Sequence, residues 1–242
     1  PVDTFPSKPY DIGIQSMHLA DADLLYAVKG AKPLPGLDFN YIQLRDIAID
    51  VDSFAMYGTS LSVPLKRLYA TERSGLNIDA SGYFAMDSTE IRAERFHILS
   101  RGSSLDLSTI YGLSAEASQA PLQANLMAEI APYDIAIAQP SLKSMVSALP
   151  RNRKIRLQLD LIGTLADLNL RSAAASMAGY WDIKASGKLR DMDNFDNAVG
   201  NLAISGNLAN LNFVKPMLLD NASQNDINLP PFKIAGAAKI NR

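Results

Sequence analysis

Length, composition and charge narrow the class of protein. The chain has 242 residues, of which 48% are hydrophobic and 20% are charged, and its net charge is −2. A nearly neutral net charge gives no electrostatic footprint for nucleic acid, so no nucleic-acid partner is expected. The absence of cysteine excludes disulfides, thiolate zinc sites and cysteine nucleophiles.

No apolar run approaches the roughly 18 residues that a transmembrane helix needs, and the first residues do not resemble a signal peptide. The chain starts at proline, not methionine. We therefore expect a segment of a longer protein, with any anchor or signal outside it.

The first half of the chain predicts a series of strands. Apolar and polar residues alternate with the period of two that is typical of a half-buried strand. A change of parity at Arg45 and Asp46 predicts a turn or a bulge there. Pro33 to Gly36 predicts a turn, and Gly58 and Pro64 interrupt another stretch. Residues 56–68 predict an interrupted pair of strands, and the other predicted strands cover residues 11–14, 24–28, 39–44, 47–51, 76–86, 91–99, 104–109 and 122–130.

Residues 139–149 break this pattern and predict a short amphipathic helix. Pro140 suits a first helical turn, and the apolar residues that follow recur at spacings of three and four up to Pro150. A second stretch, residues 213–219, predicts one or two further helical turns before a polar loop.

The second half contains four alternating runs that each end in a glycine followed two residues later by an apolar residue. These glycines are expected at strand ends, where they permit the bends and twist of a curved sheet. Their spacing is uneven, so we expect a loose repeat of strands and not a solenoid with a fixed period. The four glycines are Gly163, Gly187, Gly206 and Gly236.

The sequence contains no recognisable catalytic or metal-binding motif. His18 and His97 lie apart from each other and outside any ligand spacing, so surface positions are expected. The Asp- and Asn-rich stretch at 191–196 lacks the glycine and the final glutamate of a calcium loop, which favours a simple turn. The basic cluster 151–154 is interpreted as a loop, and Trp181 as a core or groove-wall aromatic residue. No enzyme, cofactor or metal is predicted.

Several short motifs resemble those of the TamB-type family in the AsmA-like superfamily. One is Glu-x-Ser-Gly-Leu, carried by Glu72, Ser74, Gly75 and Leu76, with Ser-x-Leu patterns further along at residues 103–107. The helix at 139–149 leads into repeated Gly-x-Leu strand ends that begin at Gly163, Gly187 and Gly206. The similarity runs from about residue 37 to residue 239. It departs at Ala238, where leucine is usual, and it includes neither the anchoring helix nor the carboxy-terminal domain of the family.

The resemblance implies an elongated, curved antiparallel sheet that forms an open apolar trough, with one or two short helices. It implies a periplasmic location, a membrane anchor outside this segment, and transport of phospholipid acyl chains between the inner and outer membranes. It also implies a role in outer-membrane biogenesis, with an outer-membrane barrel assembly protein contacted through regions outside this segment. The residues expected to line the trough are Leu76, Ile78, Phe84, Leu126, Leu157, Leu159, Leu161, Ile183, Leu202, Ile204 and Ile234.

We expect residues 1–242 to form one continuous β-rich segment. A subdivision into strands at 1–138, the helix at 139–150 and Gly-x-Leu strands at 151–242 is possible. The alternative to the trough is a structural or adhesive β-sandwich that binds protein partners without carrying lipid, because alternating apolar residues are also typical of a sandwich core.

Overall fold

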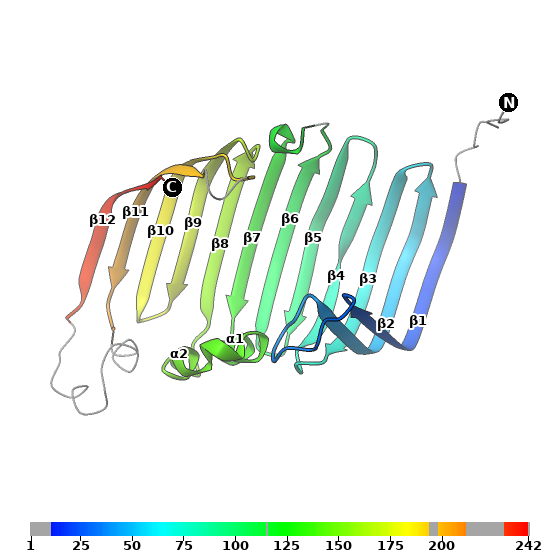
Figure 1. The fold of residues 1–242 in the computed structure, drawn as a ribbon, viewed down its shortest axis with the longest axis horizontal. Coiled ribbons are helices and arrows are strands. Elements are labelled where there is room, and N and C mark those ends of the chain that lie inside the picture. Colours follow the sequence, from blue (N-terminus) through cyan, green and yellow to red (C-terminus); the bar gives the residue numbers. More distant parts are fainter. Residues whose placement is uncertain (1–10, 115, 194–197, 212–229, 242) are drawn as a thin grey trace.

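The protein is a single twelve-stranded antiparallel sheet, in which the strands follow one another in chain order (Figure 1). The structure is a computed structural model that describes residues 11–114, 116–193, 198–211 and 230–241. The sheet does not close, because β1 and β12 lie at its opposite ends. The mainly β fold with short helices is therefore confirmed.

The strands are long, and each pairs with the next one in the sequence. Their bounds are β1 Asp11–Ala27, β2 Tyr41–Tyr57, β3 Ser60–Glu72, β4 Asn77–Met86, β5 Glu90–Ser100, β6 Ser103–Gly112, β7 Leu122–Ile130, β8 Ile155–Gly163, β9 Asp167–Met177, β10 Trp181–Arg190, β11 Val199–Leu208 and β12 Phe232–Asn241. The short helices are η1 Ala117–Gln119, α1 Pro132–Ala138, η2 Pro140–Leu142 and α2 Lys143–Ser147.

The helix expected at residues 139–149 is shorter and differently divided. Pro140 opens a 3-10 turn, and only five residues, Lys143–Ser147, form the α-helix that follows. The sequence analysis missed α1, which contains the alternating residues Ile135 and Ile137. Pro132 stands in the first turn of α1, where its missing N–H group is not needed, and so it favours a helix start. The stretch 213–219 lies outside the described residues.

Bulges lie at the places where the alternation of apolar and polar residues in the sequence shifts by one position. Asp46 has a positive φ of 53°, and the β2–β3 pairing shifts register between Arg45 and Ala48. The parity change therefore marks a bulge inside one strand, not a turn between two. Pro64 likewise lies inside β3, opposite a shift in β2, and a bulge tolerates its missing N–H group.

The four repeat glycines do not share one role. Gly163 ends β8, whereas Gly187, Gly206 and Gly236 lie inside strands, contrary to the expected strand-end positions. Gly163 and Gly187 have positive φ angles of 140° and 149° beside register shifts, whereas the space around Gly236 is open. The backbone conformation favours glycine at the first two positions, and at Gly206 an added Cβ atom would stand 2.8 Å from the Asp182 carbonyl oxygen, so a side chain is disfavoured there as well.

Fully buried apolar side chains are few, and they lie in strands as well as in the connections. Ala70 and Met177 are almost fully buried, at 0% and 1% exposure. Val146 and Leu149, at the end of the helical segment, are buried as well. Within the described residues each strand packs mainly against its sheet neighbours, and no second sheet covers either face. The sandwich architecture weighed from the sequence is therefore not the one adopted.

Candidate functional site

One face of the sheet carries two long rows of apolar residues, although a few polar side chains such as Thr109 and Glu72 share that face. In an antiparallel sheet, directly paired residues point to the same face, so the register shows which side chains lie together. One row of paired residues crosses all twelve strands and contains no polar side chain. It consists of Leu19, Ile49, Leu68, Ala80, Ile98, Leu105, Ala128, Leu157, Ala175, Ile183, Gly206 and Ile234.

A second row crosses the sheet nearer the other ends of the strands. From β1 to β11 its only polar group is the hydroxyl of Tyr111. The row consists of Ile12, Met56, Leu61, Met86, Ile91, Tyr111, Leu122, Gly163, Leu168, Leu189 and Gly200. We call the face that carries both rows the apolar face.

The structure places the predicted lining residues on this face. Ile183 and Ile234 are partners of Gly206 in the first row, and Leu126 is paired with Leu159. Leu76 lies in the turn just before β4, two residues from Ile78 and therefore with the same parity. Ten of the predicted residues stand in strands of the apolar face: Ile78, Phe84, Leu126, Leu157, Leu159, Leu161, Ile183, Leu202, Ile204 and Ile234.

The predicted lining residues include none from β1, β2, β3, β5, β6 or β9, although each of these strands contributes to the apolar face. The alternation is unbroken in β6, whereas in other strands, such as β5, a bulge shifts it by one residue. In β5, for example, Ala93 and Phe96 share the apolar face although they are three residues apart, because Arg95 occupies a bulge with φ of 50°. In the sequence, a spacing of three between apolar residues of one strand would have indicated such a bulge.

The apolar face is sheltered but not covered. In the C-terminal strands, Leu157, Ile183 and Ile204 are half-buried, whereas their polar neighbours Gln158 and Lys184 are exposed. At the β1 end the apolar side chains are open, with Ile12 and Leu19 at 40% and 42% exposure. Within the described residues, no second layer closes this face into a core.

The opposite face carries most of the polar side chains, with charged pairs between neighbouring strands, and a few apolar residues such as Leu99 and Met127. The Arg67 guanidinium donates to Asp79 at 3.1 Å, and this hydrogen bond raises the pKa of Arg67. His97 Nδ1 lies 2.6 Å from Asp106 Oδ1, on the next strand. Other pairs join His18 to Asp50, Lys66 to Asp52, and Arg156 to Glu129. We call this face the polar face.

Both histidines lie on the polar face, as expected for surface histidines. Ser81 is the register partner of His97, so a serine, a histidine and an aspartate stand side by side on β4, β5 and β6. Within the described residues, however, no hydrogen bond joins Ser81 to His97.

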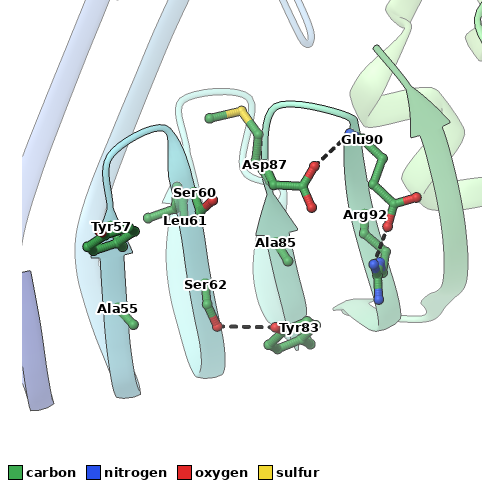
Figure 2. Close-up of a pocket in the computed structure, with 11 residues that line it drawn as sticks. Ala55, Tyr57, Ser60, Leu61, Ser62, Tyr83, Ala85, Asp87, Glu90 and Arg92 are labelled. Atoms are coloured by element: carbon green, nitrogen blue, oxygen red, sulfur yellow. Dashed lines mark hydrogen bonds and ion pairs between the residues drawn. The ribbon is translucent and has the colours of Figure 1, made fainter. Parts of the chain in front are cut away.

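The main depressions lie over the polar face. One of about 290 Å³ spans β2 to β5 and contains Tyr57 and Tyr83 (Figure 2). Ser62 donates a hydrogen bond to the Tyr83 hydroxyl group, and Arg92 is paired with Glu90. A second depression, of about 480 Å³, overlies small side chains such as Ala174 and Ser205. Both are shallow features between rows of side chains on an open sheet.

No cluster of three or more metal-ligating side chains occurs in the described part of the chain. The stretch 191–196 lies partly outside that part, so the turn predicted there stays a prediction. None of the helices described is long and apolar enough to cross a membrane.

Comparison with known proteins adds no relative. No family model, no curated protein and no solved structure matches this chain.

Proposed function

We propose that this chain is a non-enzymatic segment of a TamB-like protein that shields phospholipid acyl chains along its apolar face. The observation that supports this most directly is the row of apolar residues that crosses all twelve strands without a polar interruption. Removing an acyl chain from water stabilises it by about 0.8 kcal/mol per CH₂ group, and this interaction needs no directional chemistry.

In this proposal the sheet bends into an open trough with the apolar face inside. Bulges increase the local bend and twist of a strand, and this sheet contains them in both halves. The polar face then forms the outer wall, on which charged pairs such as Arg67–Asp79 remain hydrated.

The cellular setting proposed follows from the short motifs shared with TamB-type proteins. We place the segment in the periplasm, anchored through a helix outside residues 1–242, on a path for phospholipids between the inner and outer membranes. A barrel assembly protein of the outer membrane is the proposed partner in outer-membrane biogenesis, through regions beyond this segment.

A second candidate function is the binding of a protein partner without lipid. Edge strand β1 supports it, because among the described residues β2 is its only strand neighbour, and the side chains of Ile14 and Met17 are 38% and 41% exposed. An exposed edge strand is a template for an added strand from another chain.

Photo-crosslinking distinguishes the two candidates. A photo-reactive amino acid at Leu157, Ile183 or Ile204 should capture phospholipid, as identified by mass spectrometry of the adduct. The same residue at the matched polar-face positions Gln158, Lys184 and Ser205 should not. Equal capture at both parities, or capture of protein alone at the apolar positions, contradicts lipid shielding.

A charge on the apolar face supplies a second test. Ile204 is half-buried, so an aspartate in the Ile204→Asp variant can remain hydrated in an open trough. We expect the variant to keep the circular dichroism spectrum of the unchanged protein while lipid capture at Ile183 falls. A folded Ile204→Asp variant with undiminished capture would contradict the proposal.

A further inference from the structure

The connection between β1 and β2, residues 28–40, passes along the ends of the neighbouring strands to the helices that follow β7 (Figure 1). We call these residues the strap. The Leu37 N–H donates to the Ala138 carbonyl at 2.9 Å, which joins the strap to the end of α1. The Arg73 guanidinium donates to the carbonyls of Leu34 and Gly36, at 2.6 and 3.1 Å. The strap and helices therefore form one continuous border.

Gly36 lets the strap lie this close to the helices. Its φ is 84°, and an added Cβ atom would stand 2.6 Å from the Ala138 carbonyl oxygen and 2.4 Å from the Pro140 ring. Asp38 accepts hydrogen bonds from the backbone N–H groups of Leu34 and Asn40, and these bonds lower the pKa of its carboxyl group. Specific hydrogen bonds and a close backbone approach therefore hold the strap against the helices.

All exposed charges in this border are positive. Asp38 and Asp134 are the only acidic residues in 28–40 and 131–154, and both are buried, at 7% and 5% exposure. Lys154 lies 3.6 Å from Glu129. Five further basic residues are exposed and have no ion pair within the described chain: Lys29, Lys32, Lys143, Arg151 and Arg153.

Large apolar side chains stand out from the same segments. Phe39 and Leu34 on the strap are 74% and 62% exposed, and Tyr133 on α1 is 60% exposed. Leu142 and Met145, in η2 and α2, are exposed at 37% and 40%. Residues 28–40 and 131–154 thus combine exposed apolar groups with uncompensated basic groups, and we call them the basic edge.

We propose that the basic edge docks the protein on the surface of an anionic lipid bilayer. Basic side chains are attracted to anionic headgroups, and aromatic and aliphatic side chains insert at the boundary between headgroups and acyl chains. A net-neutral protein partner would not match five unpaired cations. The basic cluster at 151–154, which the sequence analysis interpreted as a plain loop, is part of this surface.

The inference does not depend on lipid shielding by the apolar face, because it concerns contact with an intact bilayer at another surface. Edge variants should still capture lipid at Ile204 when phospholipid is supplied in detergent. Loss of vesicle binding with capture retained assigns the failure to the basic edge, and the reverse result assigns it to the apolar face.

Vesicle co-sedimentation tests the proposal. The unchanged protein should bind vesicles of phosphatidylcholine with about a third phosphatidylglycerol at least tenfold more tightly than pure phosphatidylcholine vesicles, and salt should weaken this binding. Reversal of three edge charges, Lys29→Glu, Lys32→Glu and Arg153→Glu, should weaken the binding by at least about tenfold.

The matched control reverses three exposed lysines outside the basic edge, Lys184→Glu, Lys188→Glu and Lys233→Glu. This triple variant has the same net charge as the edge variant and should bind the anionic vesicles more tightly than the edge variant. Equal binding by the two variants, or equal binding of the unchanged protein to neutral and anionic vesicles, overturns the proposal.

The lack of native cysteine permits a test that leaves the edge charges intact. A polarity-sensitive fluorophore on Ser141→Cys, in η2, should shift to shorter wavelength on anionic vesicles. The same label on Ser186→Cys, on the polar face, should not shift. A shift at Ser186 without one at Ser141 would place the contact elsewhere and overturn the proposal.

Discussion

The apolar and polar faces are built from the same twelve strands, yet they differ in almost every interaction. Across the apolar face, a complete row from Leu19 to Ile234 contains only apolar residues. On the polar face, which carries the alternate residues of the same strands, His97 lies beside Asp106 and Arg67 binds Asp79. Side chains alternate between the two faces along each strand, and each bulge inserts a residue where the sequence alternation shifts. Apolar residues on both sides of a bulge therefore stay on the same face.

The bulges make this contrast possible. In β3, Leu65 and Leu68 share the apolar face although three residues separate them, and the β3–β4 register shifts between them. Without the shift, every apolar residue on one side of the bulge would point to the polar face. The sheet therefore contains irregularities where the sequence changes parity.

The sharpest way to break the contrast is a charge at a buried position of the apolar face. Ala80 is 5% exposed, and its register partners Leu68 and Ile98 are apolar. We expect Ala80→Asp to lower the free energy of unfolding by about 3 kcal/mol or more, because the carboxylate is buried without a partner. Urea unfolding followed by circular dichroism measures the loss.

The control for this change lies one residue along the strand. Ser81 points to the polar face beside His97, so Ser81→Asp should change stability by no more than about 0.5 kcal/mol. Similar losses at both positions would show that parity does not control burial in β4.

A comparison of two glycines sharpens the contrast within the apolar face. Gly187 has a φ of 149°, and an added Cβ atom would lie 2.1 Å from the Asn201 carbonyl oxygen. We expect Gly187→Ala to cost about 2 kcal/mol through backbone strain and this clash. Gly236 has no atom within 4 Å of such a Cβ, so Gly236→Ala should be neutral or stabilising by up to about 1 kcal/mol. Thermal unfolding of both variants checks the difference, which a shared structural role would abolish.

The smallest effect concerns the turn between β4 and β5. Hydrogen bonds from Thr89, through its hydroxyl and backbone N–H groups, lower the pKa of Asp87. A carboxyl group with a lowered pKa in the folded state stabilises the protein above its ordinary pKa, and this contribution is lost as pH falls through the lowered value. Asp87→Asn should therefore be less stable than the unchanged protein near neutral pH, and the difference should shrink in acid.

Unfolding curves measured across the acidic range follow that difference. A gap between the two proteins that stays constant from neutral to strongly acidic pH would show that the Asp87 charge does not stabilise the turn. Thr89→Val, which removes the hydroxyl donor and keeps the backbone one, should give an intermediate result.

Much of the sheet was predictable from the sequence, and the reason is local. The alternation in residues 76–86 and 122–130 matches β4 and β7 closely, because period-two apolar patterns rarely suit a helix. Ten of the eleven predicted lining residues stand in strands of the apolar face for the same reason. The helices were less predictable, since α1 carries an alternating Ile135 and Ile137 that also fits a strand.

The sequence by itself determined the alternation of many strands, and with it which side chains share a face within an uninterrupted run, because a strand backbone repeats every two residues. Only the tertiary structure decided that the twelve strands lie in chain order in one open sheet. It alone brought residues 28–40 to α1 and buried Asp38 and Asp134, which leaves the exposed charge of the basic edge entirely positive. Such long-range contacts depend on how separate elements pack, and no local pattern in the chain encodes that packing.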